Sequence, residues 1–424
     1  MVAGDLPAGD LPAGDAAEDA AGRLVREEWA RVVATLVRVT GDIELAEDAV
    51  ADAVVRALER WPRDGVPDSP RAWLTVTAKR RAVDLIRREA RRSGKEAEAG
   101  LLGEPGPEPA EAVRDDTLRL VFTCCHPALS ADAQVALALR TLGGLSTVEV
   151  ARALLVSEAT MAKRLTRAKQ KIAYARIPYR VPPAEELPRR LSAVAATVYL
   201  IFNEGYAAGA GADLVRVGLA DEAIRLGRLL AELMPDEPTV LGLLALMLLH
   251  DARRAARVDD RGHPVLLPDQ DRSRWDGAAI REGVELVGAG LRRTPDRPDA
   301  YVVQAAIAAC HALAVSYPRT DWDAVISWYD VLLTVHDTPV VRLNRAVAVA
   351  ERDGPAAGLA LVDQLGNLDG YPWWHASRAE LLHRLGRTEP ARAAYRQAIA
   401  LGMSEPLTAH LRRRLAELPD GTLS

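Results

Sequence analysis

Two short stretches of this 424-residue chain concentrate cations that could contact nucleic acid. The first spans 79–92 (KRRAVDLIRREARR), and the second spans 157–172 (SEATMAKRLTRAKQKI). The spacing of apolar residues predicts an amphipathic helix in each stretch, with Arg and Lys gathered on one side. The whole chain is mildly acidic, with a formal net charge of -5. We therefore expect it to touch nucleic acid at chosen places and not over its entire surface.

The second stretch predicts a helix that could read DNA. Its predicted apolar stripe consists of Met161, Leu165, Ala168 and Ile172. The opposite face carries Thr160, Lys163, Arg164, Arg167 and Lys171. A short helix is predicted over 147–155, and Ser157 can cap the next helix after a tight turn. This is the pattern of a helix-turn-helix, whose second helix enters the major groove. The alternative is an ordinary helical pair with a solvated charged face.

The first stretch combines cations with a nearby aromatic ring. Trp73 lies about one and a half turns upstream of Lys79, and the cations outnumber the acids Asp84 and Glu89. Cations beside an aromatic ring suit backbone contact and base stacking on opened DNA. The alternative is a charged surface helix that precedes a linker.

An acidic row precedes this basic helix. Glu44, Asp48 and Asp52 are spaced at i, i+4 and i+8, so they share one helical face. Carboxylates in this position repel DNA, and the row therefore indicates a protein partner. Taken alone, such a row is most often a solvated face.

Composition and the positions of helix-starting and helix-breaking residues predict an all-α chain of several parts. Hydrophobic residues make up 49% of the chain, and the strong helix formers Ala, Leu and Arg dominate it. The expected parts are a disordered tail (1–21), three helices (22–92), a flexible acidic linker (93–116), a second helical block (117–177) and a helical C-terminal domain (189–420). In the first block we expect helices over about 24–39 and 44–60, the latter stopping at Trp61-Pro62. The third should begin at Pro70 with Ser69 as its cap.

The C-terminal part shows a repeat of about 34 residues. Pro339, Pro372 and Pro406 echo this spacing, and 381–401 resembles a tetratricopeptide repeat. Such hairpins stack into an α-solenoid with a concave surface, which could hold a protein or peptide ligand. The segment 266–276 (LLPDQDRSRWD) stands out as polar. Its Trp275 could line a groove, dock on the N-terminal half or simply anchor a loop.

Several function classes have little support. Cys124 and Cys125 precede His126, but no second ligand pair follows at zinc spacing, so we expect buried thiols and no metal or cofactor. No membrane helix or signal peptide is predicted, which favours a cytoplasmic protein. The eight His are scattered, without a His-Glu metal motif, a phosphate loop or a nucleophile elbow, so we do not expect an enzyme.

The order of these features strongly resembles the sigma-70 factors of the extracytoplasmic-function class. The motifs that carry this resemblance are AEDAVADAVVRAL (46–58), PRAWLTVTAKRRAVDLIRR (70–88) and GLSTVEVARALLVSEATMAKRLTRAKQKI (144–172). The resemblance covers about 22–175, with the first block as region 2 and the second as region 4. The segments 199–209 and 266–276 resemble parts of the helical, repeat-containing extension that one subgroup carries.

This resemblance implies partners and site residues. Core RNA polymerase, through its β′ and β subunits, and promoter DNA are the implied partners. The residues implied to bind core polymerase are Glu44, Asp48 and Asp52. Those implied at the −10 element are Trp73, Lys79, Arg80, Arg81, Asp84, Arg87 and Arg88. Those implied at the −35 element are Ser157, Thr160, Lys163, Arg164, Arg167 and Lys171. The linker should thread toward the RNA exit path, and the extension should act as a built-in regulator.

Two other functions remain open at this point. One is a peptide-binding solenoid scaffold with a DNA-binding head, which would bind DNA unaided. The other is a dimeric repressor, whose operator would be palindromic. A sigma factor reads asymmetric elements and should bind DNA poorly without core polymerase.

Overall fold

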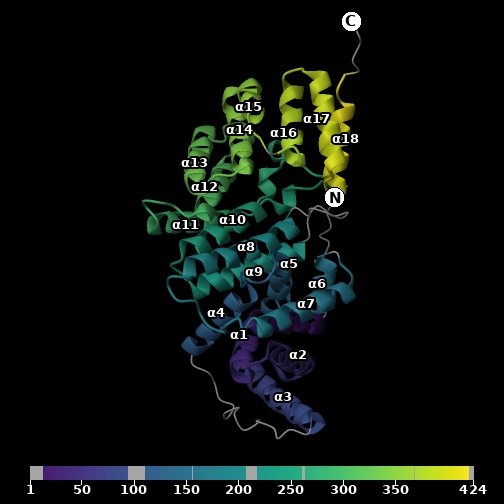
Figure 1. Ribbon diagram of the computed structural model, residues 1–424, viewed down its shortest axis with the longest axis vertical. Helices are drawn as coiled ribbons and strands as arrows, with labels where there is room; N and C mark the ends of the chain where they lie inside the picture. The colour runs from purple at the N-terminus through teal and green to yellow at the C-terminus, as the bar shows by residue number, and fades with distance from the viewer. Residues whose placement is uncertain are drawn as a thin grey trace, which may run out of the picture. The chain divides into compact units, whose positions relative to one another are not determined.

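The computed structural model describes residues 13–93, 110–154, 156–206, 217–259, 263–366 and 368–419. Within these residues the regular elements are helices. One isolated antiparallel β-bridge pairs Val258 with Pro264. The all-α prediction is therefore confirmed. The chain forms two compact units, Met1–Thr197 and Val198–Ser424, whose helices are labelled in Figure 1.

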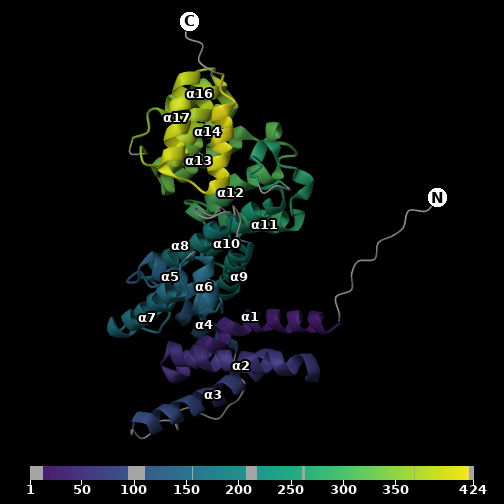
Figure 2. The same ribbon diagram turned by 90° about the vertical axis from the view of Figure 1, so that its right-hand side faces the viewer.

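The first unit begins with three helices, α1 (Ala13–Thr40), α2 (Ile43–Asp64) and α3 (Pro70–Ser93), which Figure 2 shows stacked one below another. Helix α3 begins at Pro70, as the sequence predicted. Helix α2 does not stop at Trp61-Pro62 but runs through Pro62. Trp61 is buried and meets the ring of Trp73 edge-on, with 5.6 Å between centroids, which holds this last turn in place. Gly65, at a φ of 83°, then ends the helix.

Two expectations of irregular chain need correction. The predicted tail (1–21) overlaps α1 from Ala13 onward, and 1–12 lie outside the described residues. The predicted linker (93–116) overlaps helix α4 (Ala110–Cys124), and only 94–109 lie outside the described residues. Within α4, the buried carboxylate of Asp116 accepts a 2.6 Å hydrogen bond from Nε of Arg38, which holds this helix against α1.

The second block packs directly on the first within this unit. It comprises α4, α5 (Ala131–Leu137), the π-helical turn η2 (Ala138–Leu142), α6 (Thr147–Ala153) and α7 (Glu158–Tyr174). The buried indole of Trp29 on α1 donates a 3.0 Å hydrogen bond from Nε1 to the carbonyl of Thr141 on η2. Helices α1 and α4 also lie against each other along their length. The two blocks therefore form one body in this structure.

The turn after η2 approaches α1 so closely that only glycine fits. Gly144 has a φ of 74°, and a Cβ atom there would lie 2.8 Å from Cγ of Trp29. We expect Gly144→Ala to lower the free energy of unfolding by about 2 kcal/mol or more, since left-handed strain and a clash combine. Gly41→Ala is the matched control, because Gly41 has a φ of 71° with nothing within 4 Å. Gly41→Ala should lower the free energy of unfolding only through the left-handed strain, by about 1 kcal/mol. Equal losses in urea unfolding would contradict this account.

Helix α8 (Leu187–Tyr206) contributes to both units. The guanidinium of Arg190 is buried and donates a 2.6 Å bond from Nη2 to the carbonyl of Phe122. Thr197 donates to Oε1 of Gln134 at 3.1 Å. The division between the compact units therefore falls inside α8.

The second unit continues as a run of helices. They are α9 (Val217–Leu233), α10 (Pro238–Asp251), α11 (Gly277–Arg293), α12 (Ala300–Leu313), α13 (Trp322–Val335), α14 (Pro339–Asp353), α15 (Pro355–Val362), α16 (Pro372–Arg384), α17 (Thr388–Leu401) and α18 (Glu405–Ala416). Helices α13, α15 and α17 begin 33 residues apart, and so do α14, α16 and α18. The hairpin repeat is thus present in the structure, while its assignment as a tetratricopeptide repeat stays a prediction. Among the described residues, no helix is long and apolar enough to cross a membrane.

Candidate nucleic-acid interface

Helices α6 and α7 form the predicted helical pair with a short connection. Ser146 and Glu149 form a reciprocal capping box at the start of α6. Ser157 caps α7, where its Oγ accepts from the amide of Thr160 at 3.2 Å and lies 2.8 Å from the Thr160 hydroxyl. Both caps hold the pair in register, so α7 starts at a defined point. Ser157 therefore has a structural role in addition to any contact with DNA.

The two faces of α7 separate as the sequence predicted. Met161, Leu165 and Ala168 are buried, and Ile172 is half-buried. Four of the predicted DNA-facing residues are exposed, namely Thr160, Lys163, Arg167 and Lys171. These side chains share a shallow groove with Ser130 and Ala133 at the start of α5. The arrangement presents a cationic surface on a rigid helix.

Arg164 differs from its neighbours on α7. Its side chain is 27% exposed, and Nη2 lies 3.3 Å from Oδ2 of Asp132 on α5. Because Asp132 is itself largely exposed, this ion pair is weak and can exchange for a phosphate or a base edge. Arg164 is therefore held at the edge of the groove, whereas Arg167 faces solvent directly.

Helix α3 presents some, but not all, of the predicted −10 residues to solvent. The exposed ones are Arg80, Asp84, Arg87 and Arg88. Lys79 is only 8% exposed, so it does not belong to this surface. The buried apolar stripe of α3 is Leu74, Ala78 and Ala82, whereas Val83, Leu85 and Ile86 are half-buried. The small Ala side chains let α3 approach its neighbours closely, which is why Lys79, next to Ala78, is covered.

The acidic row and the basic helix are joined by an ion pair. Arg81 of α3 donates to Asp52 of α2, so each neutralises the other. Glu44 and Asp48 remain exposed on α2. Trp73 is half-buried against Trp61. The structure thus brings one predicted polymerase-binding residue into contact with one predicted −10 residue and leaves the row shorter than the sequence suggested.

Glu47 is a buried carboxylate of the first unit that was not among the predicted site residues. Its side chain is 1% exposed. It accepts from the Thr141 hydroxyl at 2.5 Å and from Nζ of Lys169 at 2.9 Å, and Nε of Arg140 lies 3.5 Å away. These partners lie on η2 and α7. One carboxylate of α2 therefore ties that helix to η2 and α7.

A sequence signal for Glu47 did exist. It falls among Ala46, Ala49 and Val50, which form the buried face of α2. An acid on an apolar face must find buried partners, because an unpaired buried charge is costly. Glu47 lies outside the i, i+4, i+8 spacing of the row Glu44, Asp48 and Asp52, so that spacing does not indicate it.

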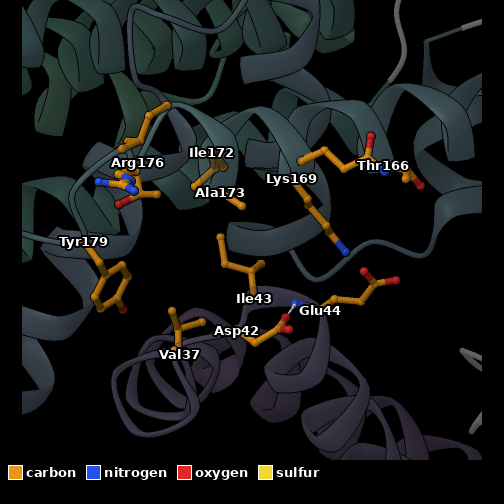
Figure 3. A pocket seen from close by; sticks show the side chains of 14 residues that line it. Val37, Asp42, Ile43, Glu44, Thr166, Lys169, Ile172, Ala173, Arg176 and Tyr179 are labelled. Atoms are coloured by element: carbon orange, nitrogen blue, oxygen red, sulfur yellow. Dashed lines mark hydrogen bonds between the residues drawn. The ribbon is translucent and has the colours of Figure 1, made fainter. Parts of the chain in front are cut away.

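The junction between the two blocks contains a cleft on one side. Figure 3 shows Ile43 and Glu44 from the start of α2 facing Lys169 and Ala173 of α7 across a cavity of about 430 Å³. Tyr179 closes one end, and its hydroxyl donates toward the carbonyls of Ala34 at 2.9 Å and Asp116 at 3.1 Å. On this side of the junction, polar contacts surround the cavity, whereas α1 and α4 pack against each other elsewhere.

The adjacent cysteines lie in the core of this unit. Cys124 and Cys125 are buried and carry free thiols. Burial raises the pKa of both thiols, that of Cys125 to about 12, so both stay protonated at neutral pH. Protonated thiols are poor metal ligands, and no His, Cys, Asp or Glu group suited to a metal occurs in the described ranges.

Comparison with known proteins identifies relatives of this chain. Three family models match it: Sigma-70 region 2 over residues 24–92, Sigma-70, region 4 over residues 119–172, and a family of unknown function (DUF6596) over residues 190–290. An uncharacterized protein of Rhizobium meliloti (strain 1021) is 45% identical over 396 residues, which cover 92% of this chain and 93% of the relative. The probable RNA polymerase sigma factor RfaY of Xanthomonas campestris pv. campestris is 31% identical over 157 residues, which cover 36% of this chain and 39% of that protein.

Proposed function

We propose that this chain directs core RNA polymerase to promoters with defined −10 and −35 elements. It belongs to one family with its Rhizobium relative, and it is an extracytoplasmic-function-like sigma factor with sigma-70 regions 2 and 4. Sigma factors of this family are not enzymes, and their domains imply transcription initiation. The −35 element would be read by α7 and the −10 element by α3.

The observation that carries this proposal is the exposed cationic face of α7 on a doubly capped helix-turn-helix. Thr160, Lys163 and Arg167 project from one side of α7, opposite its buried stripe. An α-helix fits the major groove, where Arg and Lys bind guanine edges and phosphates. Arg80 and Arg88 are exposed on α3 and supply the second cationic surface. Glu44 and Asp48 are the exposed carboxylates that we assign to the β′ subunit. We assign the linker to the RNA exit path.

The packed first unit cannot reach both promoter elements at once. A compact unit of this length has a radius of gyration of about 16 Å, hence a diameter of about 40 Å. The −10 and −35 elements lie about 25 base pairs apart, which is about 85 Å along B-DNA. We therefore infer that core polymerase separates α1–α3 from α4–α7, breaking the Glu47 contacts to Thr141 and Lys169.

The test is in-vitro transcription with core polymerase, followed by start-site mapping. We expect discrete transcripts that require both the chain and core polymerase, and weak DNA binding by the chain alone. Failure to direct initiation from any promoter would reject the proposal. Tight binding to a palindromic site without polymerase would favour a repressor instead.

We assign a regulatory role to the second unit, whose DUF6596 segment has no known role. The test is a chain that ends at Thr197. A cut after Tyr179 would remove Arg190 and Leu191, which are buried in the first unit, and would confuse unfolding with loss of regulation. We expect the promoter-specific yield to differ from that of the full chain. An unchanged yield would contradict the assignment.

A further inference from the structure

A cavity of about 640 Å³ lies within the second unit, among α10, α12, α13 and α14. Its buried wall is apolar and includes Leu246, Leu249, Ile307 and Leu332. Volumes between about 300 and 1,000 Å³ with mostly apolar walls are typical of small-molecule sites. The cavity therefore has the size and surface to hold a compact organic ligand.

One cation in the cavity wall has no counter-charge. Arg253 lines the cavity, and no Asp or Glu does. In the described part of the chain, Nη2 of Arg253 binds the Tyr206 hydroxyl at 2.6 Å and lies 3.3 Å from Nδ1 of His250, and no carboxylate pairs with it. The next residue, Arg254, is by contrast bound to the carboxylates of Asp221 and Asp251. Since guanidinium binds carboxylate in a bidentate manner, Arg253 is suited to an external carboxylate.

Two half-buried histidines, His250 and His311, add neutral polar groups to the same wall. Burial, with Arg253 as the next cause, lowers the pKa of His250 to about 3 and that of His311 to about 4. Both rings are therefore uncharged at neutral pH. Nδ1 of His311 is buried and has no hydrogen-bond partner in the part of the chain that the structure describes. An unpaired buried polar atom in a cavity wall is costly unless a ligand or water satisfies it.

The tryptophan of 266–276 supports this wall and does not enter it. Trp275 is buried, with the guanidinium carbon of Arg272 4.3 Å and that of Arg253 5.9 Å from its ring centroid. It therefore anchors the loop, as one sequence alternative had it. This stacking holds the Arg253 side chain in place beside the cavity.

We propose that this cavity binds a small amphipathic carboxylate, with its anionic head at Arg253 and His311 and its apolar body against Leu246, Leu249 and Leu332. The proposal goes beyond the role in initiation and does not depend on it. A cationic ligand is disfavoured because the wall offers no acid, and a small polar anion would leave the apolar wall unfilled.

The test is isothermal titration calorimetry of the full chain with three probes: octanoate, octylammonium and acetate. We expect saturable binding of octanoate and at least about tenfold weaker binding of the other two, because each lacks one of the two recognition features. Binding of octylammonium as tight as that of octanoate, or no saturable binding of octanoate at millimolar concentration, would overturn the proposal. No transcription is measured, so its failure is distinct from failure of the sigma-factor proposal.

Two variants locate the site. Arg253→Gln should weaken octanoate binding at least about tenfold, whereas Arg293→Gln, which removes an Arg paired with Asp236 outside the cavity, should change it less than about twofold. Ala308→Phe should block binding by filling the cavity while keeping Arg253, and it decides the matter if Arg253→Gln does not fold. Full octanoate affinity in either folded cavity variant would reject this site.

Discussion

Replacing Glu47 by alanine is expected to lower the free energy of unfolding of the first unit by about 3–5 kcal/mol. The substitution leaves Arg140 and Lys169, whose side chains are 17% and 18% exposed, without their shared carboxylate. It also removes the acceptor of the Thr141 hydroxyl. Urea unfolding of the full chain, followed by hydrogen exchange in α1–α7, assigns the loss to this unit and not to the second.

Glu44→Ala is the matched control for this prediction. Glu44 lies one turn away on α2, is exposed and makes no ion pair with a described residue. Its replacement should change stability by less than about 0.5 kcal/mol. The loss of stability in Glu47→Gln should lie between the losses in Glu44→Ala and Glu47→Ala, because the amide still accepts from Thr141 but carries no charge. A loss below about 1 kcal/mol for Glu47→Ala would show that the two blocks do not depend on this contact.

Replacing Arg167 by alanine is expected to weaken −35-dependent initiation by about 1–3 kcal/mol, or about 5- to 150-fold. Arg167 is exposed on α7 and makes no ion pair with a described residue, so its loss should not disturb folding. In-vitro transcription on a mapped promoter measures the effect. Arg164→Ala should have an effect in the same range, because exchange of its weak pair with Asp132 costs little.

Two controls separate DNA reading from general damage. Arg180→Ala removes an exposed cation beyond the end of α7 and should leave initiation within about twofold of the parent chain. On a template whose −35 element has been replaced, Arg167→Ala should have no further effect. An equal loss of initiation on both templates, or loss of helical content in Arg167→Ala, would show that Arg167 stabilises the fold and does not read the −35 element.

Local pattern was sufficient for the elements that carry the DNA-facing residues. The i, i+4, i+7 spacing from Met161 to Ala168 identifies the buried side of α7, and therefore its exposed side, without any tertiary information. Ser157 and Pro70 mark helix starts for equally local reasons, since a cap and a preset φ act on the first turn alone. Local pattern was misleading where a distant residue decided the outcome. The turn at Trp61-Pro62 stays helical because Trp61 packs on Trp73, and Lys79 is covered because Ala78 and Ala82 bring α3 close to its neighbours.

By itself, the sequence determined the all-α class, the two cationic helices and the acidic row, because these depend on helical periodicity and charge. Only the tertiary structure decided what the charges do. Asp52 is bound to Arg81, and Glu47 links α2 to η2 and α7 across more than 90 residues of chain. Among the described residues, no carboxylate pairs with Arg253 at its cavity wall. An ion pair or its absence is a property of distance in space, and periodicity along one helix carries no information about a partner on another.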